Sequence, residues 1–148
     1  LFIFTVILLF SSCAHACECA EMDEAMSLSA IDSAEVIFKG RIMMISRNED
    51  VAYPDQSRTL APHESENFSA AEIEILDMYK GISDGGMLTA YIDMVTSCGY
   101  GMLSEGQEME FIMNRYMGDL VHTNLCGTPL PKHWDMLLAG TFKYTGQE

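Results

Sequence analysis

Residues 34–46, with the sequence AEVIFKGRIMMIS, decide the fold. Every second position from Val36 to Met44 is apolar or glycine, whereas Lys39 and Arg41 fall on the opposite face. Because successive side chains of a strand point to opposite sides, this alternation predicts a β-strand with one face turned to a core.

Gly40 lies in the middle of this predicted strand. A glycine inside a strand marks a bulge or a sharp bend, and strands that close into a small barrel need such a bend. Four further segments combine alternating apolar residues with flanking turn residues and are also predicted to be strands: 68–81, 87–95, 108–116 and 118–126.

Helices are expected at both ends of this strand-rich region, over residues 20–34 and 132–142. The first shows helical spacing at Met22, Ala25, Met26 and Ser29. Five strands with flanking helices predict an all-β fold, a five-stranded Greek-key barrel of the OB type with short flanking helices. A β-sandwich with the same number of strands is the alternative.

The first ten residues, LFIFTVILLF, are all apolar apart from one threonine. This run is shorter than the roughly 20 residues that span a bilayer as a helix, and it has the length of a signal-peptide core. Residues 14–16, AHA, suit signal peptidase. We therefore expect a signal peptide at 1–16 that begins upstream of the printed sequence, and a secreted single domain at 17–148. Alternatively, LFSSC ending at Cys13 resembles a bacterial lipobox, which would anchor the protein to a membrane.

Cleavage after residue 16 removes Cys13 and leaves Cys17, Cys19, Cys98 and Cys126. Outside the cytosol such thiols form disulfides. A bond between the two early cysteines would close a small strained ring, so each is expected to pair with one late cysteine. Their C-x-C spacing fits neither the C-x-x-C pairs of zinc sites nor those of redox sites.

Cys17 would then carry the free α-amine of the mature chain. A neutral amine nitrogen is a good zinc ligand, and the carbonyl oxygen of the same residue can close a five-membered chelate with it. Catalytic zinc in a metalloprotease keeps one position open for water, which such a chain end could fill. Disulfides that hold the chain end rigid would reduce the entropy lost on binding.

Five segments, in this order, resemble the inhibitory N-terminal domain of the tissue inhibitors of metalloproteinases, within the netrin-like OB-fold family. They are CEC at 17–19, AEVIFKGRI at 34–42, IEILDMYKG at 73–81, TSCGYGMLSEGQEMEFI at 96–112 and HTNLCGTPLPKHWDML at 122–137. The resemblance implies the bridges Cys17–Cys98 and Cys19–Cys126. It also implies that Cys17 chelates the zinc of a target metalloprotease, and that the protein holds no cofactor of its own.

The resemblance further implies that residue 18 enters the S1′ pocket of the target, and that Thr96 and Ser97 line the same contact ridge. The family usually has Thr or Ser at the position of Glu18. Burying an unpaired carboxylate in an apolar pocket costs several kcal/mol, so Glu18 predicts a target with a polar or basic S1′ subsite. The family's domain has a third disulfide bridge, and this sequence lacks the cysteines that would form it.

The formal net charge of −14 argues against nucleic acid and anionic lipid as partners. We expect a monomer whose partner is a zinc metalloprotease, and no membrane contact unless Cys13 is lipidated. The sequence contains neither a phosphate-binding loop nor a nucleophile elbow, so we do not expect an enzyme. The alternative function is a netrin-like binding module without inhibitory activity, anchored through Cys13.

The remaining chemistry-bearing residues are expected to be structural or solvated. The histidines have no ligand spacing, and Trp134 is expected to cover the core from the last helix. Asn67 begins a glycosylation sequon within the polar stretch 47–67, whose length is typical of functional loops. Alternating acids are expected on solvated strand faces: Glu72, Glu74, Glu108 and Glu110.

Overall fold

The computed structural model describes residues 21–47, 60–65, 67–81, 86–94, 103–122 and 127–144. In chain order the elements are α1 (Glu24–Ser33), β1 (Val36–Arg47), the 3₁₀ turn η1 (Pro62–Glu64), β2 (Phe68–Lys80), β3 (Met87–Asp93), β4 (Glu108–Tyr116), β5 (Asp119–His122) and α2 (Pro131–Leu138). The predicted five strands and two short flanking helices are confirmed. Of the predicted fifth strand, residues 123–126 lie outside the described part of the chain.

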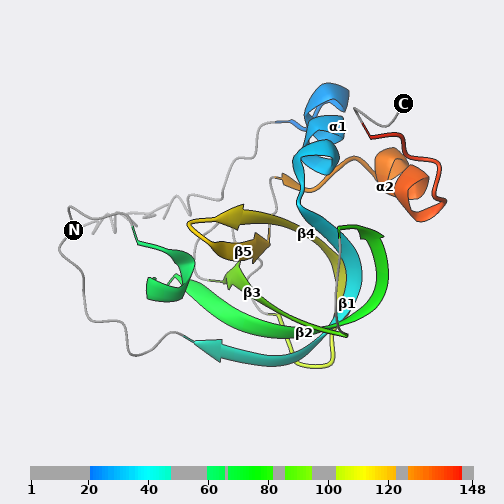
Figure 1. Ribbon diagram of the computed structural model, residues 1–148. Helices are drawn as coiled ribbons and strands as arrows, with labels where there is room; N and C mark the ends of the chain where they lie inside the picture. The colour runs from blue at the N-terminus through cyan, green and yellow to red at the C-terminus, as the bar shows by residue number, and fades with distance from the viewer. Residues whose placement is uncertain are drawn as a thin grey trace, which may run out of the picture.

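The five strands form one closed ring in the order β1-β2-β3-β5-β4 (Figure 1). β1 closes it, because this long strand pairs antiparallel with β2 along one edge and with β4 along the other. β3 and β5 are parallel neighbours, through Tyr91 and Val121, whereas the other pairs are antiparallel. A single mixed sheet that closes on itself differs from the two packed sheets of the alternative sandwich.

The irregularity expected at Gly40 is present in the pairing of β1 with β2. The register shifts between Lys39 and Gly40, where the extra residue is Leu76 of β2. A Cβ atom at Gly40 would lie 2.6 Å from Cγ2 of Ile73 and 2.8 Å from Cε2 of Phe38. The absence of a side chain therefore allows the strand to bend closely over its own core.

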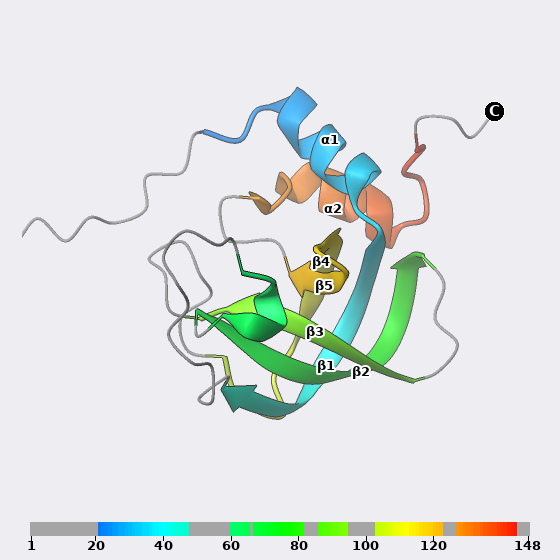
Figure 2. The ribbon, with the colours of Figure 1, turned by 60° about the vertical axis from the view of Figure 1, so that its left-hand side comes forward.

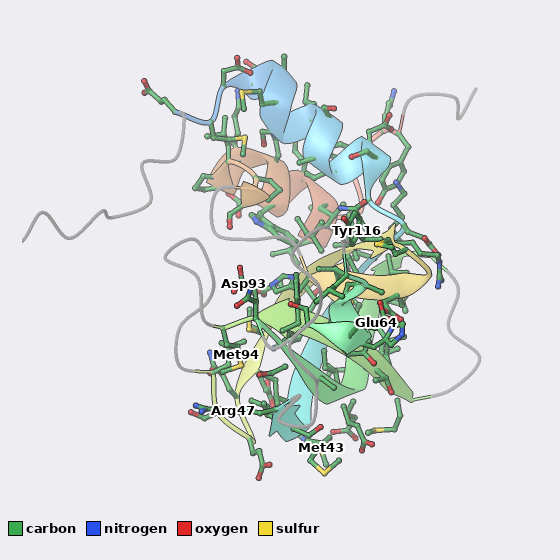
Figure 3. All side chains as sticks on the ribbon, turned by 90° about the vertical axis from the view of Figure 1, so that its left-hand side faces the viewer. Met43, Arg47, Glu64, Asp93, Met94 and Tyr116 are labelled. Atoms are coloured by element: carbon green, nitrogen blue, oxygen red, sulfur yellow. The ribbon has the colours of Figure 1, made fainter. Side chains whose placement is uncertain are left out.

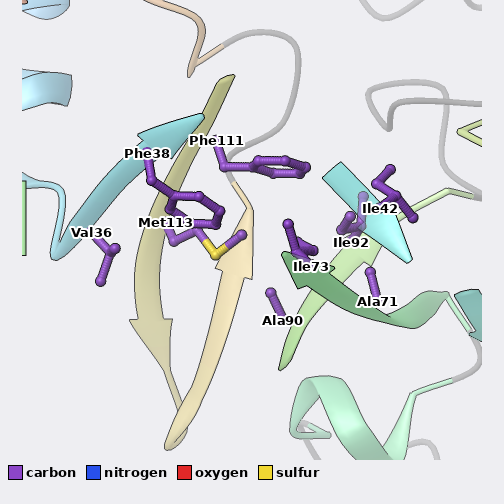
Figure 4. Packing of buried hydrophobic residues seen from close by; sticks show 9 residues of the cluster. All are labelled: Val36, Phe38, Ile42, Ala71, Ile73, Ala90, Ile92, Phe111 and Met113. Carbon is purple, nitrogen blue, oxygen red and sulfur yellow. The ribbon is translucent and has the colours of Figure 1, made fainter. Parts of the chain in front are cut away.

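The interior of the ring holds the larger hydrophobic core. Phe38 and Phe111 stack there with ring centroids 5.1 Å apart. Figure 4 shows the nine buried members of this cluster, which come from β1, β2, β3 and β4: Val36, Phe38, Ile42, Ala71, Ile73, Ala90, Ile92, Phe111 and Met113. The alternation of apolar residues in β1 and β4 thus places every second side chain inside the ring.

Met44 departs from the predicted inward face of β1, because its side chain is exposed. A further register shift, between Ile42 and Met44, changes the phase of the alternation at this point. One extra residue in a strand turns the following side chains to the other face. The predicted alternation therefore holds only as far as Ile42, and beyond it Ile45 packs against the core of the ring.

A second core lies outside the ring, where α1 and α2 cover β1 and β4. Figure 2 shows the two helices side by side over this part of the ring. Its buried members are Ile31, Ala34, Ile37, Ile112 and Leu137. Trp134 packs against this cluster, as expected for a residue that covers the core from the last helix.

Helix α1 begins at the N-cap Asp23, whose side chain accepts a hydrogen bond of 2.7 Å from the backbone of Met26. Its buried residues are Ser27 and Ile31. The positions that indicated this helix in the sequence lie on a different face and are mostly exposed: Met22, Ala25, Met26 and Ser29. The helix was predicted correctly, but its buried face was not marked by those positions.

Lys80, at the end of β2, stabilises the C-terminal end of α1. Its ammonium group donates hydrogen bonds to the carbonyl oxygens of Ile31, at 3.1 Å, and Asp32, at 2.6 Å. The last four carbonyls of an α-helix generally have no partner within it, and the helix dipole favours a cation there. Burial lowers the pKa of Lys80 from its ordinary value.

Candidate functional site

The residues predicted to carry the inhibitory function lie outside the described part of the chain. These are Cys17, Glu18, Cys19, Thr96, Ser97, Cys98 and Cys126, together with the alternative anchor Cys13. The structure describes segments that flank them along the chain.

Two of these flanking segments are the ends of β3 and β5. Because the two strands are parallel neighbours, their carboxyl ends point toward the same end of the ring. β3 ends at Asp93, five residues before Cys98, and Met94 follows it (Figure 3). His122 marks the described end of β5, four residues before Cys126.

The other two flanking segments meet at α1. Met22 and Gly127 line the same surface groove, of about 480 Å³, along the exposed face of this helix. Met22 is three residues after Cys19, and Gly127 follows Cys126 directly. Three residues of extended chain span at most about 11 Å. Along the chain, Cys19 and Cys126 are therefore each close to a residue that lines this groove.

Ser27 fixes the segment after Gly127 against α1. Its hydroxyl oxygen lies 2.6 Å from Nδ1 of His133 and accepts a hydrogen bond of 2.8 Å from the backbone N–H of Leu130. Both Ser27 and His133 are buried. No local pattern around Ser27 predicted this role, since the residues that it contacts are more than 100 positions away.

An ion pair at the surface joins the same two helices. Oε1 of Glu24 lies 2.9 Å from Nζ of Lys132 and 3.9 Å from Nε2 of His133. The hydrogen bond and the charge of Lys132 lower the pKa of Glu24. Because Glu24 and Lys132 are both largely exposed, this pair contributes little stability beside the buried contacts of Ser27.

His122 is buried where β5 ends. Its Nδ1 atom lies 2.9 Å from the carbonyl oxygen of Ile112, and its ring stands edge-on to Phe111 with centroids 5.1 Å apart. Burial lowers the pKa of His122 from 6.5 to about 4, and the hydrogen bond to Ile112 opposes this only in part. The imidazole is therefore neutral at pH 7.

A cavity of about 500 Å³ lies between α2, the segment before it and the outer face of β4. The ring of His122 and the side chain of Ile112 belong to its wall, together with Trp134 and Leu138 from α2. The lining is mostly apolar. Sequence reasoning missed this cavity because its wall combines two strands and a helix that have no shared local pattern.

His63 lies in η1, away from the other two histidines. Oδ2 of Asp119 accepts a hydrogen bond of 3.1 Å from the backbone N–H of His63 and lies 2.6 Å from its Nδ1. The imidazole also lies beside Tyr91, with ring centroids 6.4 Å apart. The end of the polar stretch 47–67 is thus attached to β5 and β3, and Asn67 is exposed next to β2.

Charged side chains cover the outer face where β1 meets β2 and β4. The guanidinium of Arg41 lies 3.0 Å from Oε2 of Glu74 and 2.6 Å from Oε1 of Glu108, and Lys39 also approaches Glu108. The hydrogen bond from Arg41 lowers the pKa of Glu108. These acids lie on a partly or fully exposed face, as the alternation predicted.

Within the described ranges, no three His, Cys, Asp or Glu side chains are placed to hold a metal ion. None of the helices in the described ranges is long and apolar enough to cross a membrane.

Comparison with models of known protein families gave no match, and comparison with curated proteins gave none either. The likeness to the tissue inhibitors of metalloproteinases therefore rests on the resemblance of sequence motifs.

Proposed function

We propose that this protein is a secreted inhibitor of zinc metalloproteases that acts through the N-terminal amine and carbonyl of Cys17. The observation that carries the proposal is the C-x-C pair directly after the apolar leader, in a chain whose β-strands form one closed ring. In this proposal the ring is an OB-type barrel of the netrin-like family, with strand order β1-β2-β3-β5-β4.

The inhibitory chemistry would come from the backbone rather than from a thiol. The α-amine nitrogen and the carbonyl oxygen of Cys17 would coordinate the zinc of the target and displace its water. The water is the nucleophile of a metalloprotease, so its loss stops hydrolysis. The metal belongs to the target, and the inhibitor is itself neither an enzyme nor a cofactor-binding protein.

The bridges Cys17–Cys98 and Cys19–Cys126 would hold this chain end rigid. Two features of the described residues support them. The ends of β3 and β5, which lead toward Cys98 and Cys126, point to the same end of the ring. Gly127, next to Cys126, shares a groove with Met22, which follows Cys19 closely. Peptide mapping without reduction tests the pairing, and a Cys17–Cys126 link would contradict it.

Selectivity would depend on the residues beside the chelating group. Glu18 would enter the S1′ subsite of the target, and Thr96 and Ser97 would lie along the same ridge. A carboxylate is expensive to bury without a partner, so the proposed target has a polar or basic S1′ subsite.

The experiment that tests the mechanism compares three forms of the protein that differ only at the N-terminus. Native mature protein beginning at Cys17 is compared with its N-acetylated form and with a form extended by one alanine, against a panel of zinc metalloproteases. We expect inhibition by the native form alone, since acetylation and extension both convert the α-amine of Cys17 into an amide, which is a poor zinc ligand. Equal inhibition by all three forms would refute chelation by Cys17.

Analysis of the mature protein by intact mass separates this proposal from the alternative. A chain that begins at Cys17 supports it. A chain that begins at a lipidated Cys13 would instead favour the membrane-anchored binding module, because Cys17 would then lie inside the chain and have no free amine.

A further inference from the structure

The cavity beneath α2 has the composition of a binding site for a small organic molecule. Its volume, about 500 Å³, lies within the range of ligand pockets in proteins. Ile112 and Leu138 give it apolar walls, and Trp134 adds an aromatic surface. Figure 2 shows α2 above β4 and β5, the elements between which this cavity lies.

Two carboxylates border this apolar space. Glu110, on the outer face of β4, and Asp135, on α2, both line the cavity. Neither side chain forms an ion pair with any residue in the described ranges. The lysines of this region are engaged elsewhere, since Lys39 approaches Glu108 and Lys132 is paired with Glu24.

The imidazole of the wall does not oppose a positive charge. His122 is neutral at pH 7, because burial lowers its pKa to about 4. An acidic border, a neutral imidazole and an aromatic ring together favour a cation, since the face of an indole attracts an ammonium group and two carboxylates stabilise it.

We propose that this cavity binds a small amphipathic cation, in which an ammonium group is joined to an apolar body of about the size of one aromatic ring. The apolar body would lie against Ile112 and Leu138. The ammonium group would lie near Trp134, Glu110 and Asp135. This site is separate from the proposed inhibitory chain end, and neither proposal depends on the other.

Trp134 makes the test direct, because it is the single tryptophan of the chain and it lines the cavity. The protein is titrated with phenethylammonium, with the neutral 2-phenylethanol and with the anionic phenylacetate, and both tryptophan emission and heat of binding are recorded. We expect phenethylammonium to bind most tightly, about tenfold more tightly than the alcohol, and phenylacetate most weakly. The preference for the cation should diminish as salt is added, whereas binding of the alcohol should not change.

Variants assign the charge preference to the two carboxylates. Glu110→Gln and Asp135→Asn should each weaken binding of phenethylammonium by about twofold to fivefold and leave binding of 2-phenylethanol unchanged. Glu72→Gln is the matched control, since Glu72 is an exposed carboxylate on β2 that does not line the cavity. Leu138→Ser should weaken binding of both probes, because it removes part of the apolar wall.

Three results would overturn the proposal. The first is that phenethylammonium produces neither a change in emission nor heat up to its solubility limit. The second is that the alcohol or the anion binds as tightly as the cation. The third is that Glu72→Gln weakens binding of the cation as much as Glu110→Gln and Asp135→Asn do.

Discussion

The hydroxyl oxygen of Ser27 and Nδ1 of His133 lie 2.6 Å apart and join the first helix of the chain to the last. The same hydroxyl accepts a hydrogen bond from the backbone N–H of Leu130. One buried serine therefore satisfies two polar groups at the start of α2. It also holds that helix above β4, where the cavity and the second core depend on its position.

Ser27→Ala should destabilise the protein by about 1–3 kcal/mol, since it leaves the partly buried N–H of Leu130 and the buried imidazole nitrogen of His133 without this partner. Urea denaturation followed by circular dichroism measures the change in the free energy of unfolding. Ser29→Ala, at an exposed position of the same helix, is the control and should change it by less than about 0.5 kcal/mol. Equal losses in the two variants would show that the contact with His133 contributes nothing.

His122 should make the protein less stable in mild acid. Its pKa is about 4 in the folded protein and close to 6.5 in the unfolded chain, so the unfolded chain takes up the proton first. Stability that is present above pH 6.5 is therefore lost as the pH falls toward 4, by up to about 3 kcal/mol.

The measurement is the free energy of unfolding between pH 7 and pH 4.5, a range chosen to lie above the titration of most carboxylates. His122→Gln should remove most of the slope in this range. The control His63→Gln should retain the slope, because the side chain of His63 is exposed in η1 and is not buried as that of His122 is. A slope that is the same in the native protein and in His122→Gln would contradict the assignment.

Gly40→Ala should destabilise the protein by about 1–3 kcal/mol, because the new methyl group would overlap Ile73 and Phe38 in the core of the ring. Thermal and urea denaturation both report this loss. Gly86→Ala is the matched control, since a Cβ atom there has no neighbour within 4 Å. If the two alanine variants were equally stable, the close approach at Gly40 would not constrain the fold.

Met117→Asn should stabilise the hairpin between β4 and β5. Met117 and Gly118 form its two-residue turn, and both have positive φ, 51° for Met117 and 96° for Gly118. Asparagine adopts this conformation more readily than methionine, so the expected gain is about 0.5–1 kcal/mol. Met136→Asn, at an exposed position of α2, should give no such gain, and a loss of stability in Met117→Asn would contradict the interpretation.

Glu18→Thr tests the proposed contact with the target. We expect this variant to inhibit metalloproteases with apolar S1′ pockets about tenfold or more better than the native protein does, because the cost of burying a carboxylate is removed. Inhibition constants across a panel of proteases measure the change. Glu21→Thr, three positions further along the chain, is the control. Unchanged selectivity in Glu18→Thr would mean that this residue does not enter the pocket.

The local elements of this protein follow from short patterns in its sequence. The alternation in β1 and β4, together with the turn residues that separate the strands, predicted all five strands because a strand exposes alternate side chains to its two sides. The pattern of β1 also located the irregular pairing at Gly40. Beyond Ile42 the same pattern failed, because a further register shift changed the phase and left Met44 in solvent.

The sequence by itself therefore determined the strands, the helices, the irregular pairing at Gly40 and the position of the C-x-C pair after the apolar first ten residues. Only the tertiary structure decided the closure of β1 on β4, the parallel contact of Tyr91 with Val121 and the cavity between Trp134 and the sheet. The physical reason is range. Secondary structure depends on side chains a few positions apart, whereas contacts such as that of Ser27 with His133 join residues 106 positions apart and leave no local pattern.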